Sequence, residues 1–318
     1  MRHHQRLLTP LALGVLSLAL ASCDDQPTQP NLPAEAAPVA ATSSPARDTW
    51  IPRAPDHVER VEAVTATVPN AAGQSILYVI GGWIRGLGGG LNLVKAYNVT
   101  TNTWSKKHDL PIGLASINGA GVIGGKIYIA GGARHAYGWG MYHAFVYDPA
   151  KDTWTQLPDM PVRGEFGVTG VIDDKLYVAE MKDLQADHSV LLRYDPATKK
   201  WAMLPSPKHA YHMGGVLYGK LYLVGHTTEM YDPATNQWTD KAPPPQGPYF
   251  TGLSTAAVAQ TKLYVFDGGT LIYSPLSDSW TVRGSGPGQV GATAARVFVD
   301  GQPRIEVVSE LDNYQYVP

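Results

Sequence analysis

The chain has 318 residues, and its 25 Lys and Arg against 27 Asp and Glu give a formal net charge of −2. Nucleic-acid binders usually concentrate positive charge on one face, so a slightly acidic chain leads us to expect no nucleic-acid partner. Charged residues are only 16% of the chain, whereas Gly and Pro number 33 and 25, which is typical of many strands joined by tight turns.

The first 22 residues combine positive charge with an apolar run. Arg2 and Arg6 precede the run at 7–20, which is too short to span a bilayer but suits a secretory signal. The run leads into Leu-Ala-Ser-Cys, ending at Cys23, the only cysteine of the chain, and this sequence is similar to a bacterial lipobox. The resemblance implies cleavage before Cys23 and lipid attachment to it. We therefore expect an extracytoplasmic protein that contacts a bacterial membrane through its lipid anchor only.

A Pro-rich segment at 23–45 follows this signal. Its prolines lie among Ala, Thr, Ser and Gln and include Pro27, Pro30, Pro33 and Pro38. Such a composition has little apolar surface to bury and stays extended, so we expect a tether. The remaining residues, 46–318, are expected to form one folded domain.

An octapeptide recurs through this domain, and its Trp always follows its Tyr by seven positions. The five intact copies are 97–104, 147–154, 194–201, 231–238 and 273–280. A sixth copy is split between the two ends, because residues 316–318 followed by 46–50 read Y-V-P-A-R-D-T-W. Repeats of about 40 to 50 residues cannot bury their apolar faces alone and must stack. Five intact copies and one split copy predict a closed ring.

Each repeat is predicted to contain four strands. Two strand-like runs flank Gly124-Gly125, a dipeptide that suits a hairpin turn with positive φ. The matching positions in later repeats are Asp173-Asp174, Tyr218-Gly219, Asp300-Gly301 and the less suitable Gln260-Thr261. A third strand ends at the Tyr-x-Pro turn and a fourth begins near the Trp. The sequence thus predicts an all-β, six-bladed β-propeller of four-stranded antiparallel blades, closed by the N-terminal strand joining the C-terminal blade.

Glycine doublets follow the second strand of several repeats. They are Gly81-Gly82, Gly131-Gly132 and, displaced by one position, Gly268-Gly269. Together with the Tyr-Asp-Pro turns and the spaced Trp, they resemble the kelch repeat, and the resemblance covers roughly 48–318. The doublet is replaced in the other repeats by Ala179-Glu180, Gly225-His226 and Ser309-Glu310. We expect the propeller to be less regular at those three corners.

The two faces of the predicted propeller differ in loop length. The Tyr of the second strand and the Tyr of the turn are 19 residues apart in the first two repeats and 17 in the third, but 9 in the fourth and fifth. The loops concerned emerge on the same face as the connections between blades. We call this the long-loop face, and we expect a binding site where the first three blades raise it.

Aromatic and basic side chains gather in the first two long loops. Flat rings beside Arg and His donors suit an apolar sugar face or a protein hot spot, so we expect a protein or glycan ligand here. The alternative is that these rings only cover the rim of the blade. The candidate binding residues are Trp83, Arg85, Arg134, His135, Tyr137, Trp139 and Tyr142.

The connections between blades lead to the innermost strands, so some of their side chains should reach the channel mouth. Arg163 and Tyr211 are further binding candidates there, and Glu165 and His212 are a candidate acid–base pair. Such a pair must converge within hydrogen-bond reach of one substrate position. Packing between neighbouring blades is the alternative role of all four residues.

No metal site and no cofactor are expected. His209 and His212 are three residues apart, which places their side chains on opposite faces of a strand. Galactose oxidase, a kelch relative, depends on a copper radical with a Tyr–Cys crosslink, whereas the single cysteine of this chain belongs to the lipobox. The resemblance therefore does not extend to that activity.

Two functions remain open. The favoured one is a membrane-anchored extracytoplasmic binding or scaffolding module that holds a protein or glycan on the long-loop face. The alternative is a periplasmic carbohydrate-acting enzyme of the mutarotase or epimerase type, with Glu165 and His212 near the central channel. The fold does not decide between them, because propellers carry many functions.

Overall fold

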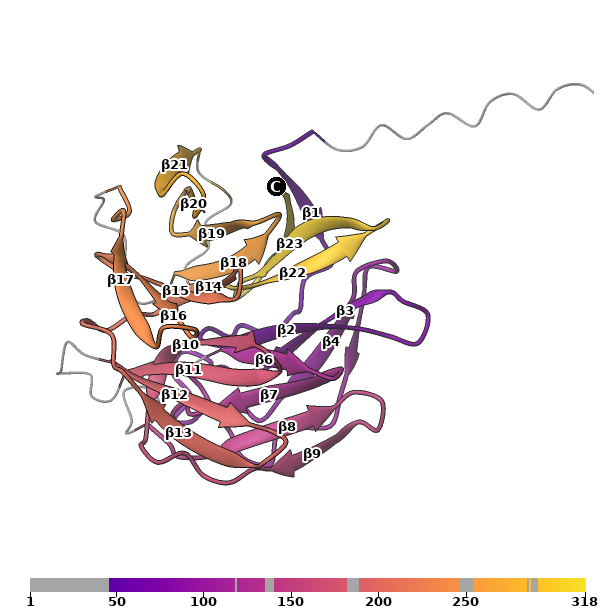
Figure 1. Cartoon of the computed structure of the whole chain (residues 1–318). Coiled ribbons are helices and arrows are strands. Elements are labelled where there is room, and N and C mark those ends of the chain that lie inside the picture. Colours follow the sequence, from indigo (N-terminus) through magenta and orange to yellow (C-terminus); the bar gives the residue numbers. More distant parts are fainter. Residues whose placement is uncertain are drawn as a thin grey trace, which may run out of the picture. The chain divides into compact units, whose positions relative to one another are not determined.

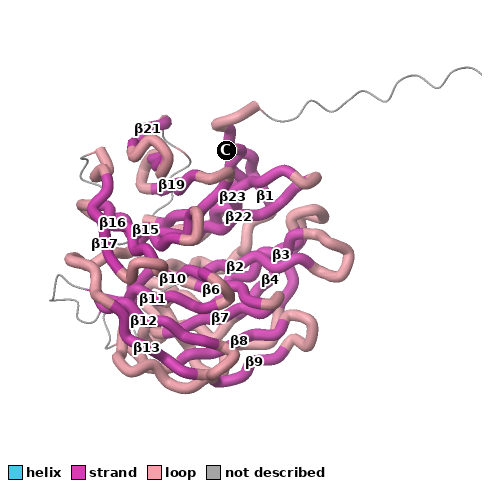
Figure 2. The backbone as a smooth tube through the Cα atoms, in the orientation of Figure 1, coloured by secondary structure: helices cyan, strands magenta, loops and turns pink. Residues whose placement is uncertain are grey.

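The computed structural model describes residues 46–117, 119–134, 140–181, 189–245, 254–284, 286 and 291–318. The chain divides into two units, Met1–Ser44 and Pro45–Pro318, and every described residue belongs to the second. These residues form strands, turns and loops, and no helix occurs among them (Figure 2). The described part of the chain contains no helical segment with the length and hydropathy needed to cross a bilayer.

The described strands form six antiparallel sheets of four, so the predicted blades are confirmed. Blade 1 contains β2 (Val64–Pro69), β3 (Ser75–Ile80), β4 (Val94–Asn98) and β5 (Thr103–Lys106). Blade 2 contains β6 (Ala120–Ile123), β7 (Lys126–Ala130), β8 (Ala144–Asp148) and β9 (Thr153–Gln156). Blade 3 contains β10 (Glu165–Ile172), β11 (Lys175–Met181), β12 (Ser189–Asp195) and β13 (Lys200–Leu204).

The second half of the chain repeats the pattern. Blade 4 contains β14 (Met213–Leu217), β15 (Lys220–Val224), β16 (Thr228–Asp232) and β17 (Gln237–Lys241). Blade 5 contains β18 (Thr255–Ala259), β19 (Lys262–Phe266), β20 (Thr270–Ser274) and β21 (Ser279–Arg283). Blade 6 contains β22 (Thr293–Val299), β23 (Gln302–Val308), β24 (Asn313–Val317) and, from the start of the domain, β1 (Thr49–Arg53).

The blades close into a ring. The first strand of each blade contacts the first strand of the next, and the cycle β2, β6, β10, β14, β18, β22 returns to β2. Strand β1 pairs with β24 in antiparallel register from Thr49 opposite Val317 to Arg53 opposite Asn313. Figure 1 shows this closure as the indigo β1 beside the yellow strands of blade 6. The split octapeptide is therefore one continuous structural unit.

The hydrophobic core is divided among the gaps between blades. Each of six buried clusters combines side chains of two neighbouring blades. Between blades 1 and 2, for example, Ile80 and Val94 pack with Ile127 and Phe145. Because each blade buries its faces against two neighbours, the burial that stabilises one blade depends on the whole ring.

The Tyr and Trp of each octapeptide lie opposite each other on the third and fourth strands. All six pairs are cross-strand partners with ring centroids 4.8 to 5.2 Å apart. In five blades the Tyr hydroxyl donates to the Asp or Asn five positions further on, and the acceptors are Asn102, Asp152, Asn236, Asp278 and Asp48. These acceptors have positive φ, which Asn and Asp tolerate well. The octapeptide is thus a self-contained hairpin that explains its constant length.

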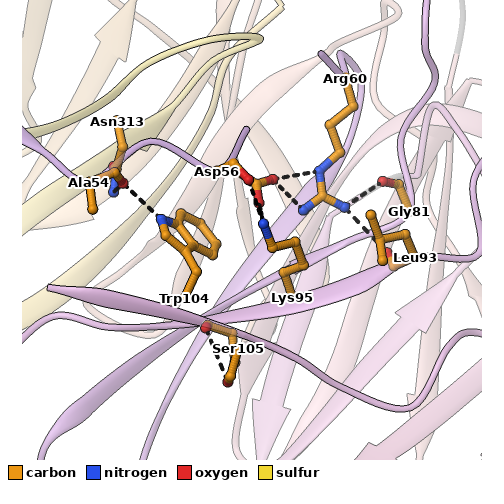
Figure 3. Close-up of polar contacts among 10 residues, drawn as sticks. Ala54, Asp56, Arg60, Gly81, Leu93, Lys95, Trp104, Ser105 and Asn313 are labelled. Atoms are coloured by element: carbon orange, nitrogen blue, oxygen red, sulfur yellow. Dashed lines mark hydrogen bonds and ion pairs between the residues drawn. The ribbon is translucent and has the colours of Figure 1, made fainter. Parts of the chain in front are cut away.

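The Trp side chains also join each blade to the connection that enters it. In blades 1 to 5 the indole Nε1 donates to a backbone carbonyl of the connection from the preceding blade. The five acceptors are Ala54, His108, Pro158, Pro205 and Ala242. Figure 3 shows the first of these bonds, from Trp104 to Ala54 at 2.7 Å, with Asn313 of blade 6 donating to the same carbonyl.

The first two strands of blades 2 to 6 are joined by the predicted tight turns. Gly124 and Gly125 have φ of 57° and 73°, and the corresponding dipeptides of the later blades also have positive φ. Gln260 and Thr261 reach 52° and 85°, although neither residue favours this region. Since neighbouring strands are antiparallel, these turns and the Tyr-containing turns lie on the face opposite the long loops.

Candidate functional site

A cavity of about 200 Å³ lies where the inner strands begin. All six blades contribute to its wall, so the cavity occupies the mouth of the central channel on the long-loop face. We call it the channel-mouth cavity. The lining residues that carry the argument below are Glu62, Thr65, Ser116, Phe166, His212 and Thr293.

Three lining residues adopt the left-handed backbone conformation without being glycine. Glu62, Ser116 and Phe166 have φ of 55°, 50° and 50°, and each lies where the chain enters the inner strand of its blade. This conformation costs free energy in non-glycine residues and is enriched at functional sites. Two contacts hold it in place: the Ser116 hydroxyl donates to the Glu62 carboxylate at 2.5 Å, and the Phe166 amide donates to the Ser116 carbonyl at 3.0 Å.

His212 is the one member of the predicted acid–base pair that lines the channel-mouth cavity. Its ring meets the ring of Phe166 edge-on, with centroids 6.2 Å apart. Burial lowers the pKa of the His212 imidazole below its usual value, and a hydrogen bond with the Phe166 backbone opposes part of this effect. His212 is therefore mainly neutral at pH 7.

Glu165 is buried and is not part of the cavity wall, although the next two residues are. Burial raises the pKa of its carboxyl to about 7, and the Glu62 carboxylate raises it further in the same direction. The two carboxyls therefore influence each other at the channel mouth. Because Glu165 lies outside the wall, the structure does not bring the predicted acid–base pair together on one cavity surface.

The other two channel candidates also lie outside the cavity wall. Tyr211 is completely buried between blades 3 and 4, and its hydroxyl contacts Glu229 at 2.6 Å and Thr227 at 2.9 Å. Tyr211 thus has the packing role that was the alternative in the sequence prediction. Arg163 is exposed and contacts a long loop instead of the cavity.

Arg163 and Tyr142 form an exposed pair on the long-loop face, which we call the Tyr142–Arg163 pair. The guanidinium lies over the phenol ring, 5.2 Å from its centroid, and Arg163 Nε is 3.3 Å from the hydroxyl oxygen. The neighbours of the pair, Met141 and Gly164, form a β-bridge that joins the loop of blade 2 to the entry of blade 3. Two exposed side chains are thereby held on a fixed backbone.

Trp83 and Arg85 occupy the long loop of blade 1. Trp83 is half-buried, and its indole donates to the Leu87 carbonyl at 2.6 Å. Arg85 pairs with Glu310 at 2.7 Å, which links this loop to the corresponding loop of blade 6. Arg134 is exposed in the loop of blade 2, and its carbonyl accepts a hydrogen bond from Gly90. The two long loops therefore support each other.

Several predicted residues lie outside the described part of the chain. They are Cys23, His135, Tyr137 and Trp139. Glu62 and Ser116, in contrast, lie at the channel mouth but were not among the sequence candidates. Aligning the blades at the entry to each inner strand would have placed both beside His212. Within the described residues, no group of three or more His, Cys, Asp or Glu is arranged to hold a metal ion.

Buried charges lie near the connection that enters blade 1. The Arg60 guanidinium contacts the Asp56 carboxylate at 2.6 Å and also donates to the carbonyls of Gly81 and Leu93. Lys95 contacts the other Asp56 oxygen at 2.6 Å. Figure 3 shows that these side chains converge on Asp56. The cluster fixes the connection on which Glu62 lies.

Comparison with known proteins agrees with the architecture. The family model described as Kelch motif matches residues 69–111 and 118–161, which contain most of blades 1 and 2. A protein of Arabidopsis thaliana whose name contains the words F-box/kelch-repeat protein is 36% identical over 73 residues. This match covers 21% of the chain and 19% of the Arabidopsis protein, so the chain spans about a fifth of that relative. The chain thus carries Kelch motifs on a six-bladed β-propeller.

Proposed function

We propose that this protein is an extracytoplasmic binding module that holds a protein partner on its long-loop face. The observation that supports the proposal is the Tyr142–Arg163 pair. Tyr and Arg are over-represented among residues that dominate binding energies at protein interfaces. Tyr142 is 39% exposed, and the β-bridge beside the pair reduces the conformational entropy that a partner would have to remove.

The Kelch motifs fit this function, because kelch propellers commonly serve as protein-binding scaffolds and the matched segments include the two longest loops. A glycan is the second ligand class that the same side chains could accept, since an exposed ring beside Arg suits a sugar face. We favour a protein because cation–π pairing already occupies one face of the Tyr142 ring. The carbohydrate-acting enzyme is less favoured, because Glu165 does not line the channel-mouth cavity.

Membrane attachment is the second part of the proposal. The lipobox-like sequence ending at Cys23 and the Pro-rich tether at 23–45 support a propeller displayed from a bacterial membrane. Mass spectrometry of the mature N-terminus should find a lipid-modified Cys23. A Cys23→Ala variant should move from the membrane fraction to the soluble fraction, and equal membrane recovery of both proteins would contradict the anchor.

The binding surface is tested by quantitative pull-down from the envelope fraction of the cells that make the protein. Proteins enriched by the unchanged chain should be lost with Tyr142→Ala and with Arg163→Ala. Tyr218→Ala is the matched control, because Tyr218 is 53% exposed and lies in a turn on the opposite face. If Tyr142→Ala retains the same partners as Tyr218→Ala, the long-loop assignment is wrong.

A further inference from the structure

The channel-mouth cavity carries negative charge without a matching cation in its described wall. Glu62 and His212 are the titratable residues among the described lining residues. The imidazole is mainly neutral, because burial lowers its pKa. The Glu62 carboxylate bonds to one hydroxyl of the protein, that of Ser116. A carboxylate in a confined space of this kind favours a positively charged ligand.

The nearest cation in the sequence, Arg60, does not neutralise Glu62. Its Nε and Nη2 atoms contact Asp56 at 3.1 and 2.6 Å, and its Nη1 atom is bonded to two carbonyl oxygens. The Lys95 ammonium is also bound to Asp56. Figure 3 shows both cations directed at Asp56. Their charge is therefore already committed to another carboxylate.

A second carboxyl lies close to the first. Glu165 is only 5% exposed, and within the described part of the chain its Oε2 atom has no hydrogen-bond partner. The electrostatic influence of Glu62 on Glu165 shows that the two groups share one region. A positive charge placed in the cavity would interact favourably with both carboxyls.

The remaining wall suits a small organic molecule. The Phe166 ring supplies an aromatic surface that can contact apolar carbon or a cation. Hydroxyl groups of Thr65 and Thr293, which lie 2.9 Å from each other, provide hydrogen-bond acceptors. Metal ions prefer several carboxylate or carbonyl oxygens at one point, whereas the wall offers a single carboxylate. A cavity of about 200 Å³ has room for about six waters' worth of liquid volume, close to one sugar ring.

We propose that the channel-mouth cavity binds a small organic ammonium ion, a primary amine on a carbon skeleton no larger than one sugar ring, with its ammonium group at Glu62. The ammonium has three donors, which suit the Glu62 carboxylate and the neighbouring hydroxyl oxygens. Its charge compensates a partly desolvated carboxylate, which a neutral ligand cannot do. A ligand anion would be repelled by the same group.

The test uses three probes that differ only at carbon 6 of glucose. They are 6-amino-6-deoxyglucose, glucose and glucuronate, which carry an ammonium, a hydroxyl and a carboxylate. Isothermal titration of the full chain at pH 7 should show the amine binding at least about tenfold more tightly than glucose, as expected for one charge-assisted hydrogen bond. Glucuronate should bind most weakly. Equal affinity for the amine and glucose, or no binding of the amine, would overturn the proposal.

Two matched variants assign the charge. Glu62→Gln keeps an oxygen for Ser116 but removes the charge, so the preference for the amine over glucose should disappear. Glu59→Gln makes the same change on an exposed residue of the same connection and should leave the preference intact. Persistence of the preference in Glu62→Gln would refute the role of this carboxylate. If Glu62→Gln fails to fold, Ala294→Phe, which fills the cavity from blade 6, should abolish amine binding in a folded protein.

The amine site and the protein-binding surface can fail separately. Tyr142 does not line the cavity, so Tyr142→Ala should bind the amine as the unchanged chain does. Loss of amine binding in that variant would contradict a cavity site. Loss of a protein partner with intact amine binding is the result expected if both proposals hold.

Discussion

Trp50 in the first strand of the ring lies opposite Tyr316 in the last, and their ring centroids are 4.9 Å apart. The same indole meets Phe266 of blade 5 edge-on at 5.4 Å. One side chain from the start of the domain thus completes blade 6 and packs against its neighbour. The stability of the ring depends on this contact, and four predictions follow from it and from the other contacts of the fold.

Removing the closing strand should destabilise the whole ring. Deletion of residues 46–54 removes β1 together with Trp50, and Trp50→Ala should by itself cost about 3 kcal/mol of unfolding free energy. Deletion of residues 25–44 removes only the proposed tether and should cost little. Denaturant titration followed by tryptophan fluorescence compares the variants. Equal midpoints for both deletions would contradict closure by β1.

The buried ion cluster should matter far more than a surface pair. Asp56→Asn leaves Arg60 and Lys95 without their counter-charge in a buried setting, and we expect a loss of about 3 to 5 kcal/mol. Asp240→Asn breaks the exposed pair with Lys208 and should leave the melting temperature almost unchanged. Differential scanning calorimetry provides the comparison. Similar melting temperatures for the two variants would show that the cluster is not a stabilising feature.

The Tyr hydroxyl bond should contribute in the blades that have it. Tyr147 donates to Asp152, so Tyr147→Phe leaves a partly buried carboxylate without a donor and should cost about 1 to 2 kcal/mol. Blade 3 has Lys199 at the position of Asp152, so Tyr194→Phe is a matched control with a smaller expected cost. Chemical denaturation of both variants measures the difference. An equal cost in the two blades would show that the octapeptide bond adds nothing.

Glu306 should make the protein less stable as the pH rises. Burial raises the pKa of its carboxyl to about 7, above the 4.5 of an exposed Glu, and the Gln315 amide opposes part of the rise. Between these two values the folded state holds a proton that the unfolded chain releases, so stability falls from pH 4.5 to pH 7 and is then constant. Glu306→Gln cannot ionise and should gain about 3 kcal/mol at pH 8 relative to the unchanged chain.

The measurement for Glu306 is the unfolding free energy at several pH values from 4.5 to 8. The curve of Glu306→Gln should be flatter than that of the unchanged chain. Glu59→Gln alters an exposed carboxylate and should keep the original slope. A Glu306→Gln variant with the slope of the unchanged chain would show that the Glu306 carboxyl is not the group responsible.

The blade number and the closure of the ring could be predicted from the sequence because the octapeptide is a local structure. Its length is fixed by one hairpin, whose Tyr, Asp or Asn, and Trp contact each other directly. No distant residue alters that spacing. The pairing of Trp50 with Tyr316 followed from the same rule applied to the two ends of the domain.

The channel mouth could not be predicted in the same way, because the distance from the inner strand to the Tyr of the second strand varies between blades. Phe166 and Tyr211 each lie eleven residues before that Tyr, yet Phe166 lines the cavity and Tyr211 is buried. A register shift between Glu165 and Val168 accounts for the difference. One extra residue sends a side chain to the other face of a strand, and nothing in the local sequence marks the shift.

Blade 6 has a consequence for how the protein is made. Its strands come from both ends of the domain, with Thr49 in β1 and Val317 in β24. During synthesis, β1 leaves the ribosome first and its partner leaves last. Blades 1 to 5 can form on the nascent chain, whereas Trp50 must wait for the final strand before it is covered. For most of translation the growing chain therefore carries an unpaired edge at its beginning, which is the stage at which chaperones would be needed most.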